Sequence, residues 1–200
     1  MRVGFSIPVW AALLLIHPVG AHAEWQIRPA LGVNVAQHTT FFGGDAAATP
    51  AKIGFGVAGA LIGNVLGIEA DFGRRSGFFP ALRGGSGNVL GSSATTLTGN
   101  VTVALPRRLT EYTLRPYFVG GAGVMFVRID QKAQTFDVST TMKTMDLGGG
   151  VTGFLTPRIG LNWDVRHFRK VGQSLEVLGV CIGPCDLSFW RVNMALAIRY

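Results

Sequence analysis

The stretch FWRVNMALAIRY, residues 189–200, has the clearest two-residue alternation in the chain. From Trp190 to Tyr200 every second residue is large and apolar, and the residues between them are polar or small. Successive side chains of a β-strand point to opposite faces of a sheet, so the stretch predicts a strand with one apolar and one polar face. The rest of the chain is needed to decide which of the two faces points to the inside.

The composition is too apolar for an ordinary soluble domain. The chain has 200 residues, enough for one domain, and a formal net charge of +7. Hydrophobic residues make up 48% of it and charged residues 14%, against about 25% charged in an average soluble protein. The mean hydropathy is +0.35. Only the N-terminus contains a long uncharged apolar run, so the other apolar residues must be distributed among alternating segments.

That N-terminal run is typical of a secretory signal peptide. Arg2 supplies the positive start, residues 3–16 form the apolar centre, and Ala21 and Ala23 are the small residues that precede a cleavage site. The alternative is an uncleaved membrane anchor, for which the run is short, because a spanning helix needs roughly 20 apolar residues. We therefore expect residues 1–23 to be a signal peptide, cleaved near Ala23, and residues 24–200 to form the folded domain.

The rest of the chain contains eight alternating segments without a sustained helical period. Short and long connections alternate strictly between them. The short ones are residues 63–64, 106–113 and 156–157, and the long ones are His38–Ala51, Arg74–Ser93, Asp130–Met142 and Arg169–Leu187. This alternation is typical of an outer-membrane barrel, with short periplasmic turns and long extracellular loops. The predicted strands are residues 25–37, 52–62, 65–73, 94–105, 114–129, 143–155, 158–168 and 190–200.

Side-chain volume decides which face is the inside. Eight strands enclose a lumen just wide enough for side chains. In a soluble barrel that lumen would have to hold Phe118, Trp163 and Trp190 together with all the apolar residues that share their faces. If the faces are oriented the other way, the small and polar residues fill the interior and the large apolar residues meet lipid. We therefore predict an all-β protein: a single eight-stranded antiparallel up-and-down transmembrane β-barrel, whose closure satisfies every backbone polar group.

Four motifs in this order resemble the OmpA-like, opacity-type eight-stranded outer-membrane barrels: GIEADFG (67–73), RPYFVGGAGV (115–124), FLTPRIGLNWDVRHF (154–168) and MALAIRY (194–200). The resemblance implies residence in the cell outer membrane and contact with its lipid and lipopolysaccharide. It also implies that Tyr200 is a C-terminal assembly signal for the barrel-assembly machinery, although most members end in phenylalanine. The alternative for Tyr200 is an interfacial aromatic residue.

The parity of the strands assigns ten charged residues to the lumen. Burying an unpaired charge costs on the order of several kcal/mol, because the ion loses its hydration. These residues are therefore expected to form a network of ion pairs. Such a network favours a structural plug, and a small gated ion path is the alternative. The ten residues are Arg28, Glu69, Asp71, Arg115, Asp146, Arg158, Asp164, Arg166, Arg191 and Arg199.

The sequence gives little support to an enzyme, and we expect no cofactor or metal. Lipid A deacylases of this barrel class use a histidine with a serine two residues later, but His167 is followed by Phe168 and Arg169. Ser174 lies too far along the loop to take that role. The palmitoyl-transferring type begins with an amphipathic helix, whereas here the first strand pattern starts at Trp25.

Cys181 and Cys185, in the motif CIGPC, lie in the last long connection. Two ligands are too few for a closed zinc site. Export through the periplasm favours a disulfide that staples the loop.

Basic residues in the long connections are candidates for contact with lipopolysaccharide phosphates. Arg74, Arg75 and Arg83 are expected in the second loop, and Arg169 and Lys170 at the start of the fourth. A simply solvated loop face is the alternative.

Two hypotheses for the function follow. The first is a non-enzymatic barrel that contributes to envelope integrity or presents four loops to an extracellular ligand or host factor. The second is a narrow gated pore for ions or small solutes, and a lipid A-modifying enzyme is less favoured. No basic patch is interleaved with aromatic residues, so nucleic acid is not an expected partner.

Overall fold

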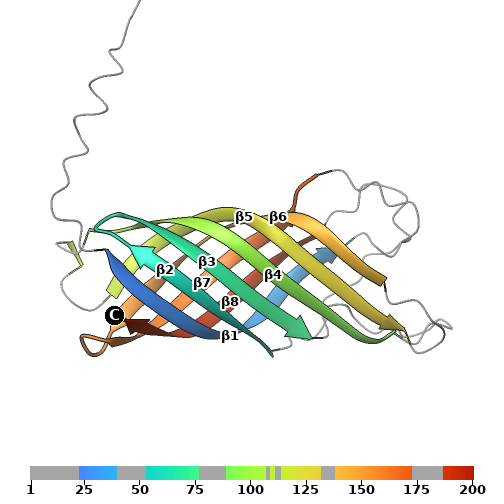
Figure 1. The fold of residues 1–200 in the computed structure, drawn as a ribbon, viewed down its shortest axis with the longest axis horizontal. Coiled ribbons are helices and arrows are strands. Elements are labelled where there is room, and N and C mark those ends of the chain that lie inside the picture. The colour runs from blue at the N-terminus through green and yellow to red at the C-terminus, as the bar shows by residue number, and fades with distance from the viewer. Residues whose placement is uncertain are drawn as a thin grey trace, which may run out of the picture.

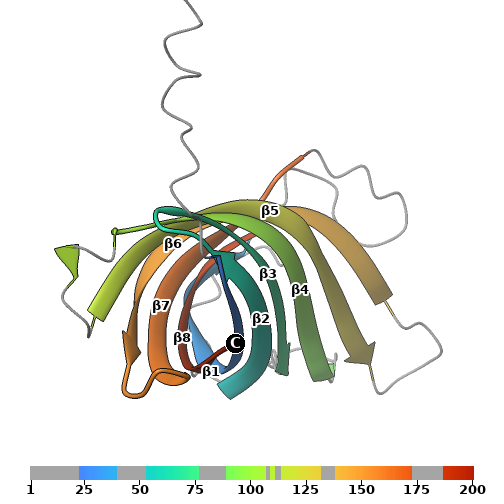
Figure 2. The same cartoon turned by 60° about the vertical axis from the view of Figure 1, so that its left-hand side comes forward.

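The computed structural model describes residues 23–39, 53–76, 89–106, 109–110, 114–131, 138–172 and 187–200. Within them, eight antiparallel strands close into one barrel, in which each strand pairs with its neighbours in sequence and β1 pairs with β8. Figure 1 shows the strands running obliquely around the barrel, and Figure 2 shows them curving around its interior. The strands are β1 (Glu24–Thr39), β2 (Ile53–Ile62), β3 (Leu66–Ser76), β4 (Val89–Ala104), β5 (Leu114–Gln131), β6 (Val138–Phe154), β7 (Ile159–Lys170) and β8 (Leu187–Arg199).

The predicted fold class is confirmed. Among the described residues, no helix is long and apolar enough to cross a membrane. The β2–β3 turn and the C-terminus lie at the same end of the barrel (Figure 1), where the backbone N–H of Tyr200 donates to the carbonyl of Trp25 at 3.0 Å. We call this end the short-turn end and the opposite one the loop end. In outer-membrane barrels the short turns face the periplasm.

Several strands are longer at the loop end than the alternation predicted. β3 continues to Ser76 and β4 begins at Val89, so Arg74 and Arg75 lie in a strand and not in the second loop. Similarly, Arg169 and Lys170 end β7 and do not begin the fourth loop. The prediction ended each strand where large apolar residues stopped. The backbone ladder does not need them, and polar segments such as Arg74–Ser76 and residues 139–141 continue to pair beyond the apolar band.

The two faces of the barrel wall have opposite chemistry. Large apolar side chains point outward, such as Ile53, Phe118 and Leu147, each more than 70% exposed. Most of the residues between them point inward and are small or polar, and the large apolar residues that also point inward, such as Phe168, gather towards the two ends of the barrel. This is the arrangement that a lipid-facing wall requires, with a polar interior.

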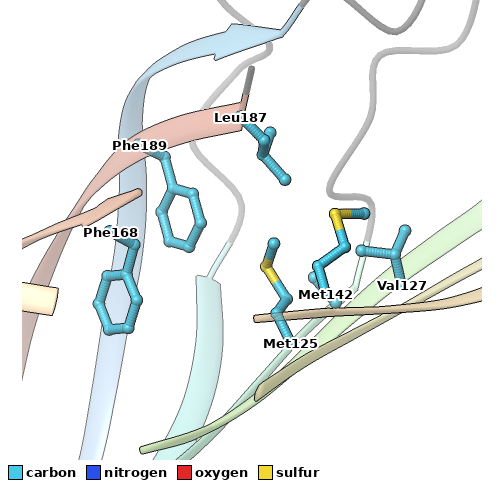
Figure 3. Close-up of a cluster of buried hydrophobic side chains, with 7 residues drawn as sticks. Met125, Val127, Met142, Phe168, Leu187 and Phe189 are labelled. Carbon is cyan, nitrogen blue, oxygen red and sulfur yellow. The ribbon is translucent and has the colours of Figure 1, made fainter. Parts of the chain in front are cut away.

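The interior has three layers. A lower apolar layer near the short-turn end contains Tyr117 with four smaller residues, and a charged layer lies above it. An upper apolar layer closes the loop end, where the rings of Phe168 and Phe189 stack at 5.1 Å between centroids. Figure 3 shows the residues of this upper layer gathered from opposite walls of the barrel. The lower layer is Ala60, Ile62, Ala104, Tyr117 and Val119, and the upper layer is Ala94, Met125, Val127, Met142, Phe168, Leu187 and Phe189.

Inward-facing glycines make room for the arginine side chains. A Cβ at Gly73 would lie 2.7 Å from Nη1 of Arg191. A Cβ at Gly54 would overlap the side chain of Arg75. Because any side chain at these positions would displace a guanidinium group, the glycines in these strands allow the lumen to hold its charged layer.

Candidate functional site

The charged layer of the lumen is the first candidate site. Arg28, on β1, donates from Nη1 to Oε2 of Glu69 on β3 at 3.0 Å and from Nη2 to Oε1 of Gln26 at 2.8 Å. The other oxygen of Glu69 accepts from the Asn100 amide at 3.2 Å. All of these side chains are buried, so each charge is compensated at short range inside the wall.

Arg166, on β7, connects three carboxylates. Its Nη1 lies 2.6 Å from Oε1 of Glu69, and its Nη2 lies 3.2 Å from Oδ2 of Asp164. Asp146, on β6, is farther away, with Oδ2 at 3.8 Å from Nη1. Because five strands, β1, β3, β4, β6 and β7, contribute to the clusters around Glu69 and Arg166, this arginine ties opposite parts of the barrel together.

A second arginine cluster lies nearer the loop end. Arg191 donates to Oδ1 of Asp71 at 2.5 Å, and its guanidinium lies 4.4 Å from the centroid of the Phe168 ring. Arg75 donates to Oδ1 of Asn193 at 2.8 Å and to the carbonyl of Phe55 at 3.1 Å. The stacking of Arg191 on Phe168 joins the charged layer to the upper apolar layer.

The described charges inside the barrel balance. Four arginines and four carboxylates are buried there. Asp146 is the least satisfied of them, because neither of its oxygens has a hydrogen-bond partner. The side-chain oxygens of Thr98 and Thr102 and Oδ1 of Asn100 are also without one. Buried polar groups of this kind typically bind internal water. The balanced eight are Arg28, Arg75, Arg166, Arg191, Glu69, Asp71, Asp146 and Asp164.

Seven of the ten residues predicted for the lumen network are buried in the barrel, and three lie elsewhere. Arg115 donates to the carbonyls of Gly63 and Asn64 at the short-turn end. Arg158 is exposed in the turn between β6 and β7. Arg199 pairs with Glu24 at 2.8 Å, also at the short-turn end. The prediction was wrong at these three positions because alternation gives the direction of a side chain but not its depth in the barrel.

Several buried polar residues of the lumen were not predicted from the sequence. Arg75 was assigned to a loop, although it continues the inward parity of Asp71 and Gly73. The uncharged members were not considered, because only ionisable residues were selected. Asn162, for example, donates to the Tyr117 hydroxyl at 3.0 Å. The buried polar residues outside the predicted set are Arg75, Gln26, Asn34, Asn100, Asn162 and Asn193, together with Thr96, Thr98, Thr102, Thr144 and Thr152.

Three other predictions concern positions away from the lumen. Tyr200 is 80% exposed at the short-turn end, and its role in assembly stays a prediction. Cys181 and Cys185 lie outside the described residues, as do Arg83 and residues 1–22. Within the described part of the chain, no group of three or more histidine, cysteine, aspartate or glutamate residues is placed to hold a metal.

The outer wall at the loop end is the second candidate site. His167, on β7, faces outward between Leu147 on β6 and Trp190 on β8, and its ring centroid lies 4.9 Å from that of Trp190. Neither of these two neighbours carries a hydroxyl or a carboxylate. Two residues along the same face, Arg169 is exposed, and Lys143 on β6 is also exposed.

A closed barrel with a polar, charge-paired interior and an apolar outer wall defines the chain as a transmembrane β-barrel protein. Residues 9–177 match the family model of the outer membrane protein beta-barrel domain, so the chain belongs to that family. It is a protein of the cell outer membrane.

Solved structures of other outer-membrane proteins share the fold. Neisserial surface protein A is 11% identical, with 88% of this chain and 97% of that chain covered and a TM-score of 0.62. OprG from Pseudomonas aeruginosa is 13% identical, with 90% of this chain and 97% of that chain covered and a TM-score of 0.54. Ail, the attachment invasion locus protein of Yersinia pestis, in complex with the heparin analogue sucrose octasulfate, is 13% identical, with 88% and 99% covered and a TM-score of 0.51. A search of curated protein sequences found no match.

Proposed function

We propose that this protein is a non-enzymatic outer-membrane barrel that contributes to envelope integrity and presents four extracellular loops to surface partners. The observation that carries the proposal is the closed interior. The charged layer is balanced and joined across the barrel by Arg166, and an apolar layer lies on either side of it. An interior of this kind supports a rigid platform, and in barrels of this type binding specificity resides in the loops.

A polyanionic surface partner suits the charge of the chain. The formal net charge is +7, and the charges buried in the barrel cancel. Of the remaining cations, Arg74 and Arg128 are exposed on strands towards the loop end. Ail, which has this fold, was solved with a sulfated heparin analogue. A ligand with repeated sulfate or phosphate groups is therefore the first class to test at the loop end of the barrel.

The proposal predicts the phenotype of a deletion strain. Loss of the gene should reduce adhesion to a sulfated polysaccharide surface or increase permeability to a large antibiotic, and expression of the full chain should restore the property that is lost. Planar-bilayer recordings of the purified barrel should show no openings. Unchanged adhesion and permeability in the deletion strain would contradict the proposal, and regular openings would favour the alternative of a narrow gated pore.

A further inference from the structure

We propose that the outer wall formed by β6, β7 and β8 at the loop end binds the phosphorylated headgroup of lipid A. The inference rests on the outer-membrane location and is independent of the function proposed for the loops. It uses Lys143, His167, Arg169 and Trp190, which face away from the lumen.

Two cations are neighbours on this wall. Arg169 pairs with Met145, and the backbone N–H of Val171 donates to the carbonyl of Lys143 at 2.9 Å. This register makes Lys143 and Arg169 diagonal neighbours on the same face of adjacent strands. Residues in that relation are about 7–8 Å apart, within reach of long side chains that converge on one group. A lysine and an arginine so placed suit a phosphate, which accepts charge-assisted hydrogen bonds from both.

The sign of the charge on this wall is uniform. Beside this wall, on the strand that pairs with β6, Arg128 is also exposed on the outer face towards the loop end. The structure describes the side chains of five acidic residues in the strands. Four of them are buried in the lumen, and the fifth, Glu24, lies at the short-turn end. The wall therefore attracts anions from the side of the lipid, where the low dielectric strengthens the attraction.

The order of residues along β7 follows the order of groups in an anionic glycolipid. Arg169 is nearest the loop end, His167 comes next and contacts Trp190, and Val165 follows, paired with Val192. A cation would meet the phosphate, the aromatic pair would lie at the level of the headgroup, and the valines would contact the acyl chains. A free phosphate would use only the contact with the cation.

The position of the wall selects lipid A over phospholipid. The long connections face the outside of the cell, and the outer leaflet there consists of lipopolysaccharide. Lipid A carries two phosphates, which match the two outward cations of the wall and the neighbouring Arg128 better than a headgroup with one phosphate does.

The test is a titration of fluorescent bisphosphorylated lipid A into the barrel in phosphatidylcholine bicelles. The double variant Lys143→Gln/Arg169→Gln is expected to raise the apparent Kd by about fivefold, as two exposed charge pairs contribute modestly. The control Arg158→Gln removes an exposed cation at the short-turn end and should bind as the unaltered chain does. The conservative variant Lys143→Arg/Arg169→Lys should retain binding.

Two further arms use dephosphorylated lipid A and phosphatidylglycerol, and both should bind more weakly than bisphosphorylated lipid A. Unchanged affinity in the double glutamine variant would overturn the proposal. So would an equal loss in Arg158→Gln, or phosphatidylglycerol binding as tightly as lipid A. Heat-dependent migration on gels verifies that each variant is folded, and the single variant Lys143→Gln provides the test if the double variant does not fold.

Discussion

Replacing Arg166 by methionine is expected to lower the free energy of unfolding of the barrel by about 3–5 kcal/mol, the usual cost of removing one partner from a buried ion pair. The guanidinium lies 2.6 Å from Glu69 and 3.2 Å from Asp164, and its loss leaves both carboxylates buried with less compensation. Urea-driven unfolding in lipid bilayers, followed by tryptophan fluorescence, measures the change.

Two matched variants separate loss of compensation from loss of a large side chain. Glu69 keeps its ion pair with Arg28 in Arg166→Met, whereas Asp164 loses the arginine at 3.2 Å. Adding Asp164→Asn to Arg166→Met removes this uncompensated charge and should restore part of the stability. The control Arg158→Met changes an exposed arginine of the β6–β7 turn, and its effect should stay within about 0.5 kcal/mol. If Arg166→Met were no more destabilising than Arg158→Met, the charged layer would not stabilise the barrel.

Replacing Val165 by arginine is expected to lower the free energy of unfolding by about 2–4 kcal/mol, because the substitution places a charge near the bilayer midplane. Val165 is at the centre of the twelve-residue strand β7, is 43% exposed and pairs with the outward-facing Val192. The same unfolding experiment in bilayers measures the difference.

Depth provides the control for this substitution. Leu161 faces outward from the same strand but is only its third residue, near the short-turn end. Leu161→Arg should therefore cost less than Val165→Arg, since the penalty falls to about 0–1 kcal/mol near an interface. Equal small costs at both positions would mean that this wall does not face lipid.

Alternation was enough to predict the strand number, the barrel and the direction of most side chains. The period of two is a local property of each strand, so Glu69 and Asp71, or Asp164 and Arg166, could be placed on one face without any knowledge of their neighbours. The volume argument then decided that this face was the inside. These steps need no information about pairing between strands.

The features that the sequence did not predict depend on pairing and depth. Alternation cannot separate Arg166, in the charged layer, from Arg158, which has the same parity but lies in a turn. Arg75 was missed because the strand was ended where apolar residues stopped. The partnership of Lys143 with Arg169 follows only from the β6–β7 register.

The central claim is that the apolar face of every strand meets lipid and the polar face lines the lumen. Trp25, Trp163 and Trp190 are 63%, 46% and 43% exposed on the outer wall. In a chain with Trp10→Phe, so that only these three emit, fluorescence should be strongly quenched in bilayers of dibrominated phosphatidylcholine and little affected by aqueous acrylamide. Strong quenching by acrylamide, with no effect of the brominated lipid, would contradict the outward orientation of this wall.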